Sequence, residues 1–267
     1  MVTDFDAFER VMWAGRAAAY ERVFARMTAH TAEALLDAVA AGRHTAVLDV
    51  GTGPGTVASV AWRRGAHVRA VDADPQMVET AARNVPGLDV RPAQLPELPF
   101  PGATFDAVVG NFVINHVGSP DATLAELRRV LRPGGRLALT CWPMPGSTAQ
   151  SIVNDAMRRA GVTWPEDVPV TPFQTYGNPE AFRALVSGAG FSDVTIDEIS
   201  WEHVVDPELW WSGPLAGVGS TGYVLTRQDQ ATIARVRAAY IAMAARYATE
   251  DGRVALPARA LLARGVR

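Results

Sequence analysis

The stretch Val47-Leu48-Asp49-Val50-Gly51-Thr52-Gly53-Pro54-Gly55 decides the fold class of this 267-residue chain. Its first residues read as a short buried strand, and its three glycines read as a tight turn before a helix over Thr56–Arg64, which Gly65 closes. Glycines let the backbone approach a ligand closely. The first turn of a helix also offers free N–H groups to an anion. The stretch therefore predicts a strand–loop–helix unit for a nucleotide-like ligand, without yet saying which one.

Two acidic residues beside this loop indicate the charge of the ligand. A dinucleotide loop reads Gly-x-Gly-x-x-Gly, whereas here the third glycine comes one residue early and Pro54 lacks an N–H group. Asp49 would lie unfavourably close to a pyrophosphate but favourably beside an ammonium or sulfonium ion. Asp72 ends the second predicted strand, 21 residues after Gly51, where a carboxylate can accept hydrogen bonds from ribose hydroxyls. Together the two acids favour a positively charged nucleoside.

Strands and helices alternate from about residue 45 to 142, which predicts βαβ units and a parallel sheet. The helix over 75–84 has Asp74 as its N-cap and Pro75 at its first position. Another helix begins at Ser119-Pro120, runs to Leu131 and stops at the breaker Arg132-Pro133-Gly134-Gly135. The expected strands span residues 46–50, 67–71, 105–110 and 137–141.

The segments on either side of this core have weaker patterns. Residues 1–42 have helical periodicity, with a second run over 31–41 that ends at Gly42. After residue 142 several prolines interrupt the pattern. There we expect a helix over 179–188, a strand over 194–199, one long helix over 226–247 and a last strand over 254–256. Four tryptophans concentrate in this part of the chain: Trp164, Trp201, Trp210 and Trp211.

Four motifs in order resemble the class I S-adenosylmethionine-dependent methyltransferases, in particular the type 11, ubiquinone-biosynthesis-like branch that acts on small molecules. The motifs are the Asp49–Gly55 loop, Val71-Asp72-Ala73-Asp74 with Met77, Phe100-Pro101-Gly102-Ala103-Thr104-Phe105-Asp106-Ala107-Val108, and Leu131-Arg132-Pro133-Gly134-Gly135. The resemblance implies an α/β, Rossmann-like fold: a seven-stranded, mostly parallel sheet with helices on both faces. It also implies one compact domain in three parts: an N-terminal helical cap (1–42), a cofactor-binding core (43–142), and the remaining strands with an acceptor-binding helical lid or insertion (143–267).

The resemblance further implies a set of cofactor-binding residues. S-adenosylmethionine would be converted to S-adenosylhomocysteine, its methionine half would lie on the loop, and its ribose would lie against Asp72. Gln94 stands where the family often has an aspartate that contacts the adenine amine, and its carbonyl can still accept that bond. The implied positions are Tyr20, Asp49, Gly51, Thr52, Gly53, Gly55, Asp72, Ala73, Met77, Gln94, Leu95 and Asn111.

Several residues have two interpretations at this stage. His116 follows the strand at 105–110, where the methyl acceptor would bind, so it is either a general base or a packed histidine. Asp74 is a helix cap or a ligand, and His203 is a base or half of a surface pair with Glu202. Trp142 follows the strand at 137–141 and is a candidate for the pocket wall. The pair Trp210-Trp211 either packs in the core or lines the pocket.

The composition excludes several classes of function. A net charge of −3 without a basic stripe disfavours nucleic acid as a partner. The single cysteine, Cys141, excludes an internal disulfide and a cysteine-based metal cluster, and we expect no metal. The chain has no lysine, which excludes Schiff-base chemistry. The first ten residues lack an apolar run and no stretch reaches 18 apolar residues, so we expect a cytoplasmic protein without a membrane partner. We also expect a monomer or a homodimer.

The function expected from the sequence is methyl transfer to a small aromatic or apolar acceptor. The abundance of alanine and arginine indicates a GC-rich genome, which favours bacterial secondary metabolism. Three alternatives stay open: a descendant that binds the cofactor but catalyses a non-methylating reaction or only binds ligand, a nicotinamide-dependent oxidoreductase, and a methyltransferase of macromolecules. Asp49 and the early third glycine disfavour the second, and the net charge disfavours the third.

Overall fold

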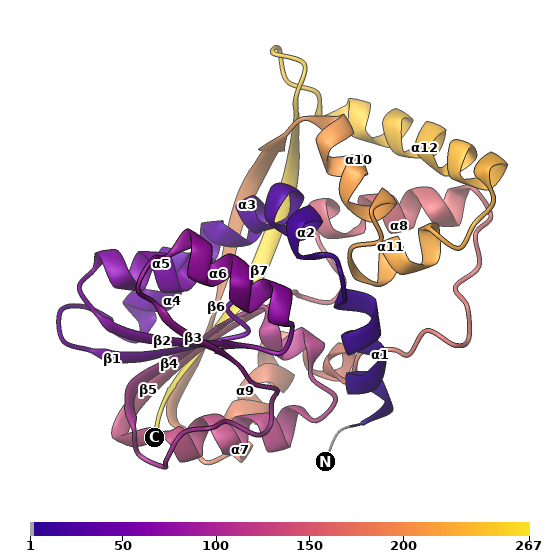
Figure 1. Ribbon diagram of the computed structural model, residues 1–267. Helices are drawn as coiled ribbons and strands as arrows, with labels where there is room; N and C mark the ends of the chain where they lie inside the picture. Colours follow the sequence, from indigo (N-terminus) through magenta and orange to yellow (C-terminus); the bar gives the residue numbers. More distant parts are fainter. Residues whose placement is uncertain (1–2) are drawn as a thin grey trace.

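One seven-stranded sheet organises the computed structural model, which describes residues 3–267 (Figure 1). Its strands are β1 (Ala46–Val50), β2 (His67–Asp72), β3 (Asp89–Pro92), β4 (Phe105–Asn111), β5 (Leu131–Cys141), β6 (Ser192–Val205) and β7 (Val254–Val266). Their order is β3-β2-β1-β4-β5-β7-β6. Strands β1 to β5 are parallel, and β7 runs antiparallel to both β5 and β6. The mostly parallel sheet confirms the predicted fold class.

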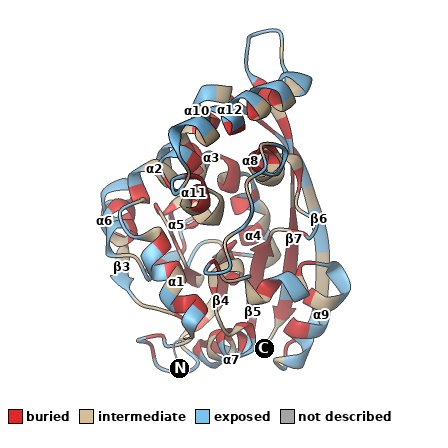
Figure 2. Ribbon diagram, turned by 90° about the vertical axis from the view of Figure 1, so that its right-hand side faces the viewer, coloured by how far each residue is buried: buried red, intermediate tan, exposed pale blue. Residues whose placement is uncertain are grey.

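Helices cover both faces of the sheet because both faces of its strands are apolar. On one face, Val47 of β1 packs in a cluster with α4 (Ala32–Ala38), α5 (Thr56–Arg63) and α6 (Pro75–Asn84). On the other face, Leu48 and Val50 pack in a cluster with α7 (Pro120–Val130) and α9 (Pro179–Gly188). Successive residues of a strand point to opposite faces. Figure 2 shows the resulting buried bands along β4, β5 and β7.

A third apolar cluster lies beyond the sheet, where β6 and β7 continue as a two-stranded ribbon. Strand β7 pairs with β5 only over Leu261–Val266, whereas it pairs with β6 from residue 254 onward. The ribbon packs with α8 (Thr148–Arg159), α10 (Pro207–Leu215) and α12 (Gln230–Ala244), and α11 (Gly219–Leu225) completes this helical part (Figure 1). Buried side chains in the cluster include Trp210, Trp211, Tyr240 and Leu256.

The N-terminal segment is helical, as predicted, but it is divided into short pieces. It comprises α1 (Asp4–Trp13), α2 (Ala17–Val23), α3 (Ala25–Thr28) and the 3-10 turn η1 (Ala29–Thr31). Gly15 has a φ of +78° and separates α1 from α2. A capping box fixes the start of α1, because the Thr3 hydroxyl accepts from the Asp6 amide while the Asp6 carboxylate accepts from the Thr3 amide.

Several predicted boundaries were wrong, including the strand expected over 194–199, which as β6 spans Ser192–Val205. The expected long helix over 226–247 begins at Gln230, because the Asp229 carboxylate accepts from the Thr232 amide and caps α12 there. Strand β5 begins directly after α7, so the breaker at 132–135 forms an irregularity within the β4–β5 pairing and not a loop. The last strand is far longer than residues 254–256, although Pro257 lies within it. The remaining 3-10 turns are η2 (Val113–His116), η3 (Pro172–Tyr176) and η4 (Ala245–Tyr247).

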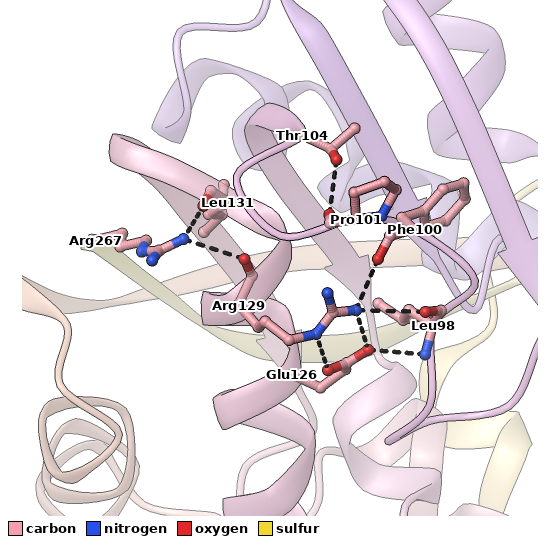
Figure 3. A network of polar contacts seen from close by, with 8 residues as sticks. All are labelled: Leu98, Phe100, Pro101, Thr104, Glu126, Arg129, Leu131 and Arg267. Carbon is pink, nitrogen blue, oxygen red and sulfur yellow. Dashed lines mark hydrogen bonds and ion pairs between the residues drawn. The ribbon is translucent and has the colours of Figure 1, made fainter.

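The motif that begins at Phe100 belongs to a loop that α7 holds in place (Figure 3). The Glu126 carboxylate accepts from the Leu98 amide at 2.8 Å, and the Arg129 guanidinium donates to the Phe100 carbonyl at 2.9 Å. Glu126 and Arg129 also pair with each other at 2.7 Å. This network fixes the chain before β4, so the motif has a structural role in positioning the strand.

Candidate functional site

A cavity of about 400 Å³ lies at the carboxyl ends of β1, β2 and β4, beneath α1. Ligands of open α/β sheets bind at this edge. Its lining comes from four segments of the chain: Asp6, Glu9, Arg10, Trp13, Ala14 and Tyr20; Gly51, Gly53, Val71, Asp72, Ala73, Asp74, Pro75 and Met77; Ala93, Gln94 and Leu95; Asn111, Phe112, Val113, His116 and Val117.

The glycines of the loop after β1 have different roles. A Cβ at Gly51 would lie 2.4 Å from Val113 Cγ2, so this glycine allows the loop to pack against η2. Gly53 has a φ of +54°, and a Cβ there would have only Tyr20 Cε1, at 3.8 Å, as a neighbour. The space at Gly53 therefore belongs to the cavity, and its bare backbone is available to a ligand.

Asp49 is a buried carboxylate with one unused oxygen. Its Oδ2 accepts from the Thr52 hydroxyl at 2.7 Å and from the Ala58 amide at 3.0 Å, whereas its Oδ1 is buried without a hydrogen-bond partner among residues 3–267. Burial, opposed by these hydrogen bonds and assisted by the charge of Asp72, raises the pKa of Asp49 to about 7. A buried acceptor without a partner is unfavourable, so a cationic ligand near Asp49 would be stabilised.

Asp72 joins two loops where it lines the cavity. Its Oδ2 accepts from the Gly53 amide at 2.8 Å, and its Oδ1 accepts from the Asp74 amide at 2.9 Å. Burial raises the pKa of Asp72 to about 6, although the two backbone hydrogen bonds oppose that rise. Each oxygen keeps a second lone pair for a hydroxyl donor.

Tyr20 and Asn111 line the cavity but are held by protein partners. The Tyr20 hydroxyl lies 3.2 Å from Thr28 Oγ1. Asn111 Oδ1 accepts from the hydroxyls of Thr31 and Thr140, at 2.7 and 2.6 Å, and its Nδ2 donates to the Thr28 carbonyl at 2.9 Å. The Asn111 side chain therefore ties the N-terminal segment to the sheet, which the sequence did not indicate.

The far end of the cavity contains Ala73, Met77, Gln94 and Leu95, as the resemblance implies for the adenosine half. Gln94 is not free, because its Oε1 accepts from Arg10 Nη2 at 2.9 Å. A bond from this carbonyl to an adenine amine would therefore share the oxygen with Arg10.

His116 faces the same cavity from η2 and pairs with an acid from α1. Its Nδ1 lies 2.8 Å from Glu9 Oε2, which also accepts from Trp13 Nε1 at 2.8 Å. Burial alone would lower the pKa of His116, but the charge and hydrogen bond of Glu9, with the charge of Asp72, raise it overall. His116 is thus part of a polar cluster, and the sequence missed its partners on α1.

Three predicted cofactor residues lie behind the cavity lining. Asp49 and Thr52 form a buried hydrogen-bonded pair under the loop, and Gly55, with a φ of +86°, packs against α6 at Ala81. These contacts support the loop from the side that faces away from the cavity.

Other side chains singled out in the sequence lie elsewhere. Trp210 and Trp211 pack in the helical part, and His203 is buried against Trp210, where burial lowers its pKa to about 4. The Trp142 ring stacks on the Phe112 ring with centroids 3.8 Å apart, so Trp142 is separated from the cavity by the Phe112 side chain. Asp74 lines the cavity and also caps α6 through the Gln76 amide.

Phe112 lines the cavity, and the sequence did not single it out as a site residue. It follows Asn111 in the left-handed region, with a φ of +60°, which is uncommon for a bulky residue. Its amide donates to Thr140 Oγ1 at 3.0 Å, and its ring lines the cavity. Backbone strain of this kind concentrates at functional sites.

Comparisons with known proteins agree with the motifs. The methyltransferase domain of type 11 matches residues 48–139. The demethylmenaquinone methyltransferase of Thermus thermophilus is 34% identical over 167 residues, which cover 55% of this chain and 74% of that protein. The malonyl-[acyl-carrier protein] O-methyltransferase of Enterobacter lignolyticus is 35% identical over 47% of this chain and 50% of that protein. The chain therefore belongs to the type 11 family of class I S-adenosylmethionine-dependent methyltransferases.

A solved structure supports the fold. Phosphoethanolamine N-methyltransferase 2 of Haemonchus contortus, in complex with phosphomonomethylethanolamine and S-adenosylhomocysteine, matches with a TM-score of 0.58 and 17% identity. The match covers 100% of this chain and 60% of that one. The chain spans about half the length of most of the curated relatives that it matches.

The cofactor of the family is S-adenosylmethionine, and the cavity fits it. The unpartnered Oδ1 of Asp49 and the raised pKa of both aspartates suit a ligand that carries positive charge. The open space at Gly53 suits close approach of that ligand to the backbone. Among residues 3–267 we find neither a cluster of ligating side chains for a metal nor a helix with the length and hydropathy to cross a membrane.

Proposed function

We propose that this protein transfers a methyl group from S-adenosylmethionine to a small acceptor molecule. The observation that carries the proposal is the pair of carboxylates beside the loop that begins at Gly51, the buried Asp49 and the half-buried Asp72. When bound, S-adenosylmethionine supplies a methyl group on a positively charged sulfur.

The residues would divide the cofactor between them. Asp72 would accept hydrogen bonds from the ribose hydroxyls, and Gly53 would let the methionine half approach the backbone. Asp49, from behind the loop, would stabilise the positive charge of that half. Met77 and Leu95 would pack against the adenine, and Gln94 would share its carbonyl oxygen with the adenine amine and Arg10.

The protein would accelerate the reaction mainly by positioning the reactants and excluding water, because the methyl donor is reactive by itself. Helix α1 covers the cavity and contributes Trp13 to its wall, while Phe112, Val113 and Val117 line it from the segment after β4. These side chains would form an apolar pocket at the reacting end, which favours a small apolar or aromatic acceptor.

The acceptor would be selected by α1 and residues 111–117 and not by the C-terminal tryptophans. Two of these, Trp210 and Trp211, are buried in the helical part, and no residue after Val117 lines the cavity within the described part of the chain. The two relatives are named for different acceptors, demethylmenaquinone and malonyl-[acyl-carrier protein], so their names alone do not choose one.

We propose a cytoplasmic enzyme of bacterial secondary metabolism.

Calorimetry with S-adenosylmethionine, S-adenosylhomocysteine and NADH tests the cofactor. We expect the first two to bind and NADH not to bind, and binding of NADH alone would overturn the proposal. Turnover is then measured with labelled S-adenosylmethionine and a panel of small phenols, anilines and electron-rich aromatic compounds. A protein that binds the cofactor but transfers no label to any of them would instead support the alternative of a non-methylating descendant.

A further inference from the structure

We propose that Glu9 positions His116 as the general base for methyl transfer to a hydroxyl group, so that the acceptor is a phenol or an enol and the product is a methyl ether. This inference rests on the proposed function and adds the chemical class of the acceptor. The observation behind it is a histidine–glutamate pair that faces the cavity and is assembled from segments 107 residues apart.

The geometry of the pair fixes the ring of His116. Glu9 Oε2 accepts from Trp13 Nε1 and lies 2.8 Å from His116 Nδ1. The Trp13 ring also packs edge-on against the imidazole, with ring centroids 5.3 Å apart. The Glu9 side chain is only 11% exposed, whereas that of His116 is 37% exposed. Both side chains line the cavity, and the imidazole is the more exposed of the two.

This arrangement also determines where the basic lone pair lies. An ionised carboxylate only accepts hydrogen bonds, so Nδ1 of His116 must carry the proton in their bond. In the neutral ring the lone pair is then on Nε2, for which residues 3–267 provide no hydrogen-bond partner. A second group that holds one nitrogen protonated and orients the ring is the arrangement by which histidine serves as a base.

The surrounding charges act on the imidazole mostly in one direction. The elements around His116 carry these titratable or charged groups: Asp6, Glu9 and Arg10 of α1, Tyr20 of α2, Asp72 at the end of β2, Cys141 of β5 and Tyr176 of η3. The acids favour the imidazolium, and Glu9 contributes most of this effect. A proton taken from an acceptor would therefore be stabilised on His116.

The acceptor class follows from what such a base can do. A neutral amine or an electron-rich carbon attacks a methyl group without first losing a proton, whereas a neutral hydroxyl oxygen gains nucleophilicity when its proton is removed. The hydroxyl proton passes to Nε2 of His116, an oxygen lone pair forms the O–CH₃ bond, and the electrons of the broken C–S bond stay on the sulfur. Charge balances, because the sulfonium charge ends on the imidazolium.

The first experiment measures the ring of His116 by NMR in the protein saturated with S-adenosylhomocysteine, with signals assigned through His116→Asn. We expect the ¹⁵N shifts to place the lone pair on Nε2, and Glu9→Gln to lower the pKa of His116. Glu21→Gln is the matched control, because it removes an acid of the same N-terminal segment that pairs with Arg83 outside the cavity. A lone pair on Nδ1, or a pKa unchanged in Glu9→Gln, would overturn the proposal.

The second experiment measures turnover against pH with matched phenol and aniline acceptors. For phenols we expect Glu9→Gln to lower kcat by about 10–100-fold and to move the acid limb of the profile to lower pH, because the base must be neutral and its pKa has fallen. His116→Asn should lose that limb. For anilines both variants should lose much less rate than for phenols, so the ratio of phenol to aniline turnover should fall by about 10-fold or more.

The outcomes separate this inference from the proposed function. Methylation of anilines or carbon acceptors only, by a protein that binds the cofactor, would overturn the hydroxyl class and leave the methyltransferase function intact. An unchanged pH profile in Glu9→Gln would reduce the pair to a structural contact. Failure to bind S-adenosylhomocysteine would contradict the proposed function itself.

Discussion

Asp72 is a single side chain that holds two loops and faces the cavity at once. We expect Asp72→Ala to weaken S-adenosylmethionine binding by about 1.5–3 kcal/mol, because hydrogen bonds to a charged group are lost. Asp72→Asn, which can keep one backbone amide as a donor to its remaining carbonyl oxygen, should have a smaller effect. Calorimetry on both variants measures the difference. Unchanged affinity in Asp72→Ala would remove the ribose assignment.

Gly53 offers a sharper residue-scale test, because its missing side chain leaves space that belongs to the cavity. Gly53→Ala should reduce cofactor affinity by more than about tenfold, since the methyl group would occupy ligand space. Gly252→Ala is the control, because Gly252 has a similar positive φ of +79° and open surroundings away from the cavity. Both variants should lose a similar, small amount of thermal stability, and only Gly53→Ala should lose binding.

At the scale of elements, α1 is attached to the core through Gly118. The Gly118 amide donates to Asp6 Oδ1 at 2.7 Å, and a Cβ on Gly118 would lie 1.8 Å from Thr3 Oγ1. We expect Gly118→Ala to disturb the capping box and loosen α1, which would weaken cofactor binding. Hydrogen exchange should increase in α1 and stay unchanged in β4 and β5.

The matched control for this prediction is Gly42→Ala, where a Cβ would meet nothing within 4 Å. If the hydrogen-exchange rates in α1 were the same in Gly118→Ala and Gly42→Ala, Gly118 would not hold the helix.

Elements whose signals are local could be predicted from the sequence. Helix α6 begins and ends as expected because Asp74, Pro75 and the apolar spacing are all within the helix or next to it. The start of strand β7 was predicted at residue 254 but its length was not, since Pro257 interrupts its pattern and its pairing with β5 joins Cys141 to Leu261, far apart in the chain.

The candidate site likewise contains residues that the sequence identifies and residues that it does not. The loop glycines and the acids Asp49 and Asp72 follow strands directly, so their motifs identify them. The partners of His116 come from α1, and nothing near residue 116 in the sequence indicates that Glu9 lies 2.8 Å away. The positive φ of Phe112 likewise depends on its neighbours in space, such as Thr140.

At the scale of the whole molecule, the two acids beside the loop after β1, Asp49 and Asp72, make stability depend on pH. The pKa values of Asp49 and Asp72 are raised, to about 7 and about 6, so between pH 4 and 7 the folded chain binds more protons than the unfolded chain at these sites. Their contribution to stability therefore falls as pH rises through that window.

We accordingly expect Asp49→Asn to stabilise the ligand-free protein by about 1–3 kcal/mol at pH 8 and by much less at pH 5, because it removes a buried charge. The same variant should bind S-adenosylmethionine more weakly. Asp37→Asn, in an exposed pair with Arg64, is the control and should show no such pH dependence. Denaturant unfolding at both pH values measures the effect, and equal stabilisation at pH 5 and 8 would contradict it.

The position of β7 between β5 and β6 has a consequence for how the chain folds during synthesis. Strand β6 is made first, yet its only partner in the sheet is β7, and the ribbon of these two strands supports the third apolar cluster. Until β7 leaves the ribosome, β6 lacks the strand that it pairs with, and the cluster that contains α8, α10 and α12 lacks the β7 side chains Leu256, Ala258 and Ala260. Pairings between distant segments form slowly and leave such surfaces exposed to aggregation. Strand β7 thus completes both the sheet and the third apolar cluster, so the two are expected to become stable together.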